Sequence, residues 1–130
     1  MKFLLSIVML IATLSANFNW PSDYEAALSQ AKAQKKDVYL FLGSEYCKYC
    51  EKFENEILSR EDVLKKLKKK YVLIYLSRDI DDIPSHLETK PVPRHYFLNY
   101  KGEIIYTTIG YRSFEGFNEL LNEVDEAKKD

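Results

Sequence analysis

The sequence predicts an α/β domain in which a central mixed β-sheet is flanked by helices. Two short apolar runs rich in β-forming residues, VYLFLG at 38–43 and YVLIYLS at 71–77, are long enough for buried strands and too short for buried helices. Amphipathic segments at helical spacing surround both runs, and two strand-like runs near the C-terminus flank a turn signal. Elements in this order are typical of a single α/β domain.

The first predicted helix covers residues 22–35 and leads into the first strand. Ser22 and Glu25 match the S-x-x-E capping box, and the apolar residues that follow recur at helical spacing. The strand at 38–43 comes next and ends at Gly43, four residues before a cysteine.

Two helices are predicted between the first and second strands. Apolar residues at helical spacing indicate an amphipathic helix from Lys48 to Leu58. Ser59, together with Asp62, is expected to cap a second helix that runs through Lys70. The second strand follows directly.

The C-terminal part is expected to form a loop, a hairpin and a helix. Residues 78–93 are polar and interrupted by prolines, which predicts a loop with at most one turn of helix. Runs at 94–99 and 103–110, separated by Tyr100-Lys101-Gly102, indicate a β-hairpin. A stripe of apolar residues predicts the last helix over 113–127.

The N-terminal residues predict export. Residues 1–16 contain one lysine, an apolar run and then small residues, a pattern typical of a secretory signal peptide. Leu14 is a poor match to the usual cleavage pattern, and the run is too short to span a bilayer comfortably as an uncleaved anchor. We therefore expect a signal peptide over 1–16, one domain over 17–130, and an exported protein of the bacterial periplasm.

Charge limits the expected classes of partner. The chain has 19 Lys and Arg residues against 20 Asp and Glu residues, which gives no electrostatic case for binding nucleic acid or an anionic membrane surface. The basic stretch VLKKLKKK at 63–70 carries apolar residues on one side, so we expect it to be a solvated helix face.

The chemistry is expected at Cys47 and Cys50, which are the only cysteines. A bridge between such near neighbours closes too small a loop to stabilise the fold much, which argues against a purely structural disulfide. At the start of a helix, the sulfur of Cys47 would point toward unpaired backbone N–H groups, which favours the thiolate. Residues three apart lie on one helix face, within reach of a disulfide. Cys47 is therefore the expected attacking thiol and Cys50 the resolving thiol.

These motifs carry a family resemblance. With a strand, then SEYCKYCEKFENEIL, then a distant Val92-Pro93 that opens a strand, hairpin and helix, the chain resembles exported thiol:disulfide oxidoreductases of the thioredoxin superfamily over residues 19–127. The resemblance implies a thioredoxin-like fold and redox roles for Cys47 and Cys50. It also implies that Pro93 is a cis-proline whose backbone faces the disulfide and pairs with substrate; Pro91 competes for this position.

Three features depart from the family pattern. Tyr46 stands where a tryptophan is common, and we expect it to shield one side of the disulfide. The first strand has no buried carboxylate for proton transfer, so that relay is absent or supplied by another group. The insert Lys48-Tyr49 matches neither the usual reductase nor the usual oxidase insert. Tyr46, Lys48, Tyr49, Val92 and Pro93 are the expected supporting residues around the two cysteines.

Two other readings stay open at this point. A CxxC pair is half of a common zinc site and also suits copper, but His86 and His95 lack zinc-ligand spacing, so we expect no resident metal. His95 is expected to be a surface or edge-strand residue, although strand alternation could place it on the side of Pro93. Alternatively, the thioredoxin-like fold could serve as a non-catalytic binding module.

The resemblance implies a protein that exchanges disulfides without a cofactor. Its expected substrates are cysteine-containing exported proteins, and a second redox protein, such as a membrane-bound one, must reset the cysteine pair. No added domain for dimerisation is seen, so we expect a monomer that acts as a reductase, with oxidase or isomerase activity as alternatives.

Overall fold

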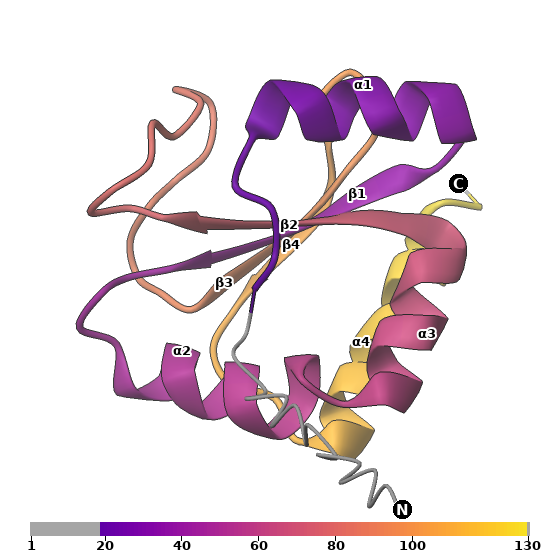
Figure 1. Ribbon diagram of the computed structural model, residues 1–130. Helices are drawn as coiled ribbons and strands as arrows, with labels where there is room; N and C mark the ends of the chain where they lie inside the picture. The colour runs from indigo at the N-terminus through magenta and orange to yellow at the C-terminus, as the bar shows by residue number, and fades with distance from the viewer. Residues whose placement is uncertain (1–18, 130) are drawn as a thin grey trace, which may run out of the picture.

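The computed structural model describes residues 19–129 and contains one mixed four-stranded sheet with helices on both faces (Figure 1). The predicted signal peptide at 1–16 lies outside the described residues. The elements in chain order are α1 (Tyr24–Gln34), β1 (Asp37–Gly43), α2 (Lys48–Phe53), the π-helical turn η1 (Glu54–Leu58), α3 (Glu61–Lys70), β2 (Tyr71–Ser77), β3 (Arg94–Leu98), β4 (Ile104–Ile109) and α4 (Phe114–Ala127). The predicted α/β class and element order are confirmed.

The sheet has the strand order β2-β1-β3-β4. β1 runs parallel to β2 and antiparallel to β3, and β3 and β4 form the antiparallel hairpin. In this register Leu42 lies opposite Arg94, and Gly43 lies opposite Ser77. The carboxyl ends of β1 and β2 and the start of β3 therefore lie at the same end of the sheet.

Alternating residues of β1 separate two hydrophobic cores. Tyr39 and Phe41 face the core shared with α2, α3 and α4, whereas Val38, Leu40 and Leu42 face the core covered by α1. Both central strands are almost wholly buried, because helices cover both faces of the sheet (Figure 1). Within residues 19–129, no helix is long and apolar enough to span a bilayer.

The helix starts differ in detail from the sequence-based expectations. The N-cap of α1 is Asp23, whose carboxylate accepts from the Ala26 N–H at 3.0 Å, so the prediction that Ser22 caps this helix was wrong. Aspartate caps as well as serine, and Asp23 lies one residue nearer the apolar stripe. α3 begins after Arg60 without a side-chain cap, because the Ser59 hydroxyl donates instead to the Asn55 carbonyl at 2.6 Å.

The helix predicted over Lys48–Leu58 is regular only in its first half. Its second half widens into η1, where the Ser59 N–H donates to the Glu54 carbonyl at 3.0 Å. Ile57 and Leu58 are both buried there. The spacing of apolar residues predicts a helix there but cannot predict that its last turn is π-helical.

The hairpin turn between β3 and β4 forms as predicted. The Asn99 side chain accepts from the N–H groups of Lys101 and Glu103, and Gly102 takes a positive φ of 83°. A Cβ at Gly102 would also overlap the Tyr24 hydroxyl, so that side chain would have to shift, but the positive φ is the main reason for glycine there.

Candidate active site

Cys47 and Cys50 lie where β1 leads into α2. Cys47 is the N-cap of α2, and its Sγ accepts a hydrogen bond from the Cys50 N–H at 3.1 Å. The two sulfurs form a disulfide with a Cα separation of 5.2 Å. In the reduced protein the same N–H would favour a negative charge on the Cys47 sulfur.

The two sulfurs differ in accessibility. Cys47 is half-buried at the surface, whereas Cys50 is 1% exposed and belongs to the core between the sheet and α2. An incoming thiol or disulfide can therefore approach Cys47, while Cys50 is reached through Cys47.

The loop before Cys47 is fixed by a residue that the sequence did not single out. The Asp79 carboxylate accepts from the Ser44 hydroxyl at 2.6 Å and from the Glu45 N–H at 2.9 Å. These bonds, that from Ser44 foremost, hold the pKa of Asp79 below its usual value. In addition, the Arg78 N–H donates to the Gly43 carbonyl at 3.0 Å. The loop after β2 thus fixes the loop that leads to Cys47. The only feature of the sequence that could have indicated this role is an acidic residue two positions after a predicted strand.

The predicted supporting residues of the CxxC motif point outward. Tyr46 is 98% exposed and Tyr49 is 58% exposed, and Lys48 is exposed as well. The expectation that Tyr46 shields the disulfide was wrong, because its ring packs against almost nothing. Together with Ile80 at 71% exposure, the two tyrosines give this end of the molecule exposed apolar surface.

Val92 and Pro93 lie at the start of β3, beside the carboxyl end of β1. The Val92-Pro93 peptide bond is cis, as the resemblance implied, and the Lys90-Pro91 bond is cis too. Val92 and Cys47 both pack against the core between the sheet and α2. The Pro93 carbonyl accepts from the Gly110 N–H at 2.8 Å, which joins this segment to the end of β4.

His95 is buried in the centre of the sheet, so the expectation of a surface or edge position was wrong. β3 lies between β1 and β4, and the side chain is 0% exposed. Nε2 lies 2.8 Å from the Gly110 carbonyl, which can only accept, so Nε2 carries the proton. Nδ1 then accepts from the Tyr39 hydroxyl at 2.7 Å.

The environment keeps His95 neutral. Burial lowers its pKa to about 4. Burial also raises the pKa of Tyr39 well above its usual value, so its hydroxyl stays a donor. The imidazole packs edge-on against Phe53 with 5.0 Å between ring centroids. Phe53 lies one turn after Cys50. The hydrogen-bonded pair of His95 and Tyr39 therefore packs under α2, the helix that carries the cysteines.

Glu54 is a second titratable group that sequence reasoning missed. It lies four residues after Cys50, is half-buried, and lines an open hollow of about 380 Å³ with Glu45, Tyr75 and Asp81 among others. Burial, then the nearby charges of Glu51 and Glu45, raises the pKa of Glu54 to about 7. A carboxyl group whose pKa is about 7 thus lies at the end of the cysteine helix α2, although β1 itself carries none.

Both histidines make hydrogen bonds within the fold. Nε2 of His86 lies 2.8 Å from the Gly102 carbonyl, away from the cysteines, and both nitrogens of His95 have partners. Among the described residues 19–129, no group of three His, Cys, Asp or Glu side chains is arranged to hold a metal ion.

The chain is similar to known proteins along most of its length. A family model described as "Thioredoxin-like" matches residues 19–99. A solved structure of a DsbH oxidoreductase has a TM-score of 0.65 at 18% identity, covering 99% of this chain and 95% of its own. A thioredoxin from Thermus thermophilus has a TM-score of 0.65 at 25% identity, covering 82% and 85%. A disulphide isomerase from Xylella fastidiosa has a TM-score of 0.62 at 18% identity, covering 84% and 99%. No curated protein matches this sequence.

Proposed function

This chain belongs to the thioredoxin-like family and has the fold and CxxC pair of its thiol:disulfide oxidoreductases, and we propose that it acts as an exported reductase of disulfides in other exported proteins. The observation that carries the proposal is the contrast between an accessible Cys47 at a helix N-cap and a buried Cys50 joined to it. This arrangement suits a nucleophile and a resolving thiol.

The first half of the reaction uses Cys47. In the reduced protein its thiolate attacks one sulfur of a substrate disulfide, forming a mixed disulfide and releasing the other substrate sulfur, which takes a proton from solvent. The Cys50 N–H, 3.1 Å from the Cys47 sulfur, stabilises the thiolate before attack.

The second half uses Cys50. Its thiol loses a proton and attacks the Cys47 sulfur, which breaks the mixed disulfide and releases the second substrate thiol. The substrate gains two electrons and two protons, and the cysteine pair becomes a disulfide. Glu54, one helical turn further on and titrating near neutrality, is our candidate for the group that accepts the Cys50 proton.

The surroundings of the disulfide supply a docking surface for substrate. We assign the backbone at Val92 and Pro93, joined by a cis peptide bond, to pairing with the substrate segment, since it immediately precedes β3 beside the carboxyl end of β1. The exposed side chains of Tyr46, Lys48 and Tyr49 would lie against the same segment.

The cellular setting follows from the sequence. A signal peptide over 1–16 would deliver the domain to the bacterial periplasm, where its substrates would be cysteine-containing exported proteins. A second redox protein that donates a dithiol, such as a membrane-bound one, would return the pair to the reduced state. We expect the domain to act as a monomer without a cofactor.

Single cysteine variants test the chemistry. Reduction of a peptide with one disulfide should be roughly a thousandfold slower or worse in Cys47→Ser, because the nucleophile is lost. Cys50→Ser should still attack and should accumulate a mixed disulfide at Cys47, detected by mass spectrometry. Reduction at the wild-type rate by Cys47→Ser would refute the proposal.

The direction of electron flow needs a separate measurement. The reduction potential of the cysteine pair can be obtained by equilibration with glutathione buffers and thiol trapping. A potential near about −270 mV supports a reductase, and one near about −120 mV would overturn that direction in favour of an oxidase.

A further inference from the structure

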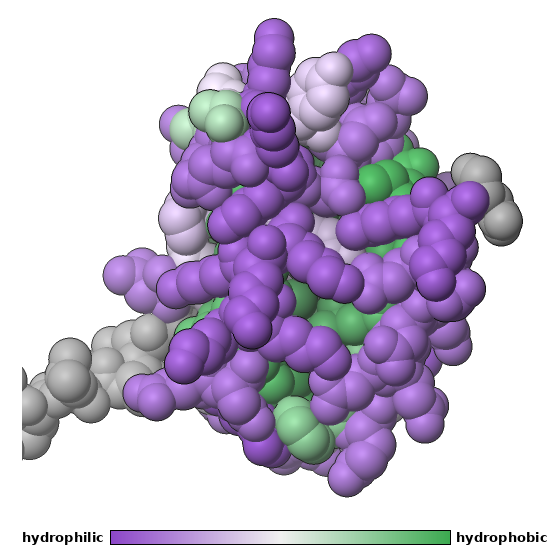
Figure 2. Space-filling view, turned by 90° about the vertical axis from the view of Figure 1, so that its right-hand side faces the viewer, coloured by the Kyte–Doolittle hydropathy of each residue, from purple (hydrophilic) through white to green (hydrophobic). Residues whose placement is uncertain are grey.

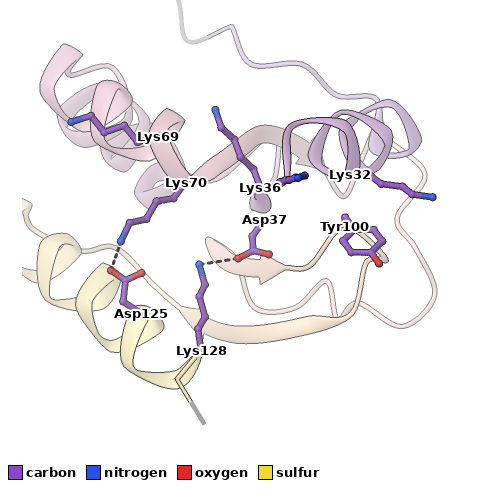
Figure 3. A pocket seen from close by; sticks show the side chains of 9 residues that line it. Lys32, Lys36, Asp37, Lys69, Lys70, Tyr100, Asp125 and Lys128 are labelled. Atoms are coloured by element: carbon purple, nitrogen blue, oxygen red, sulfur yellow. Dashed lines mark hydrogen bonds and ion pairs between the residues drawn. The ribbon is translucent and has the colours of Figure 1, made fainter.

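A lysine-lined pocket lies at the end of the sheet opposite the disulfide. It has a volume of about 590 Å³ and is lined by Lys32, Lys35, Lys36, Asp37, Lys69, Lys70, Tyr100, Asp125 and Lys128 (Figure 3). The lysines come from the C-terminal ends of α1, α3 and α4, which are far apart in the sequence. The tertiary structure thus gathers charge that the sequence distributes.

The floor of this lysine pocket is ordered. The Lys128 ammonium forms an ion pair with Asp37 at 3.0 Å and donates to the Tyr71 hydroxyl at 2.9 Å, and its side chain is only 24% exposed. Beside this pair, Lys70 forms an ion pair with Asp125 at 2.7 Å (Figure 3). Both aspartates of the pocket are therefore already occupied.

The remaining lysines keep their charge available. Within residues 19–129, Lys32, Lys35 and Lys69 have no carboxylate within ion-pair distance. Lys36 donates only to the Lys68 carbonyl, at 2.6 Å. Six lysines against two aspartates give the pocket a formal charge of 6 − 2 = +4, although the whole chain has a formal net charge of −1.

Helix ends alone do not explain this arrangement. Lysine near a helix C-terminus is favoured by the helix dipole, which accounts for lysines on each helix taken separately. Bringing three such ends together places six lysines around one pocket, which raises the local positive potential and attracts anions. Figure 2 looks onto this side of the molecule and shows hydrophilic side chains projecting across most of it.

We propose that the lysine pocket binds a phosphate-bearing anion. Lysine ammoniums bind phosphate as point charges, and several of them around one hollow suit a group with more than one negative charge. The exposed Tyr100 on the rim can add a hydroxyl donor. The same chemistry is offered by the headgroups of an anionic lipid surface and by a soluble phosphate ester.

The position of the pocket makes this binding compatible with disulfide exchange. β1 begins at Asp37 in the pocket and ends at Gly43 before the cysteine loop, so its seven residues separate the two sites by about 20 Å. A ligand held at the Asp37 end leaves Cys47 free, and the inference does not depend on the proposed redox function.

Two probes at low ionic strength test the inference on the purified protein. Inorganic pyrophosphate, followed by titration calorimetry, represents a soluble ligand. Phosphatidylcholine vesicles with and without phosphatidylglycerol, followed by co-sedimentation, represent a lipid surface. We expect wild-type protein to bind pyrophosphate or the anionic vesicles, and to release the ligand as salt increases. Binding to pyrophosphate identifies a soluble phosphate, and binding to anionic vesicles alone identifies a headgroup surface.

Two charge-reversal variants, one inside the lysine pocket and one outside it, test whether binding depends on this pocket. Lys32→Glu with Lys69→Glu should weaken binding at least about tenfold. Lys65→Glu with Lys90→Glu makes the same change in net charge at exposed lysines outside the pocket and should have an effect of less than about twofold. Both variants should keep the wild-type melting temperature. Absence of binding to both probes, or equal loss in both variants, would overturn the proposal.

Discussion

The two ends of β1 differ in whether their charged side chains have hydrogen-bonded partners. At the Gly43 end, the Asp79 carboxylate accepts hydrogen bonds from the Ser44 hydroxyl and the Glu45 N–H, and the exposed apolar groups include Tyr46, Tyr49 and Ile80. At the Asp37 end, several lysine ammoniums have no fixed carboxylate partner among the described residues.

The difference reflects what each end is proposed to do. Exchange of a disulfide requires sulfur atoms held at a defined place, so the redox end is fixed by backbone hydrogen bonds and core packing. Attraction of an anion depends on summed charge, which tolerates mobile side chains. The five predictions below test this contrast from the largest expected effect to the smallest.

Removing the buried imidazole should damage the redox end most. His95→Ala leaves the Tyr39 hydroxyl without its partner and opens a cavity under Phe53, so the free energy of unfolding should fall by about 3 kcal/mol. Urea unfolding measures this loss. The matched control is His86→Ala, where an exposed ring is lost and the decrease should stay below about 1 kcal/mol. Equal losses in the two variants would show that His95 has no special structural role.

Releasing the cysteine loop should slow exchange without unfolding the protein. Asp79→Ala removes the acceptor for the Ser44 hydroxyl and the Glu45 N–H, so Cys47 should be held less firmly and peptide-disulfide reduction should slow by roughly tenfold. Asp82→Ala changes charge equally in the same loop and is the control. An unchanged rate in Asp79→Ala would mean that the loop keeps its geometry without this carboxylate.

Replacing Glu54 should change the pH dependence. Its pKa is raised to about 7 in the folded protein against a usual 4.5, so the folded state binds the extra proton. The wild type should therefore lose stability relative to Glu54→Gln as pH rises from about 4.5 through about 7, by about 1 kcal/mol after screening by solvent. Urea unfolding at pH 5 and at pH 8 measures this difference.

The same substitution should alter the kinetics. If Glu54 accepts the proton of Cys50, Glu54→Gln should slow the resolving step above about pH 7 while leaving attack by Cys47 unchanged. Glu56→Gln, an exposed position on the same helical segment, is the control. Parallel pH profiles for wild type and Glu54→Gln would exclude this role.

The smallest effect is expected from the opposite end of the sheet. Lys32→Glu with Lys69→Glu should leave the reduction potential and the exchange rate within about twofold of wild type, because about 20 Å of strand separates the lysine pocket from the cysteine loop. Kinetic measurements at physiological salt test this independence. A large change in the potential would mean that the two ends are coupled.

Most of the architecture could be predicted from local patterns. Runs such as 38–43 and 71–77 have the composition and length of buried strands. The spacing of Cys47 and Cys50 places them one turn apart at the start of a helix. Errors at helix starts, as at Ser22 and Ser59, arose because several neighbouring side chains can satisfy the same backbone N–H groups.

What could not be predicted depends on elements distant in the chain. His95 is buried because β3 lies between β1 and β4, and no property of the RHYFL segment specifies that strand order. Likewise, the pKa of Glu54 is raised to about 7 first by burial, which depends on neighbours from β2 as well as from the cysteine loop, and then by the charges of Glu51 and Glu45.

The sequence by itself therefore determined the α/β class, the order of the elements and the chemistry of the cysteine pair, because these depend on residues within a few positions of one another. Only the tertiary structure decided that His95 is buried, that the pKa of Glu54 is raised to about 7, and that a chain of near-neutral charge acquires a positive pocket. The physical reason is that burial and electrostatic potential are sums over atoms close in space, and the fold alone sets which atoms those are.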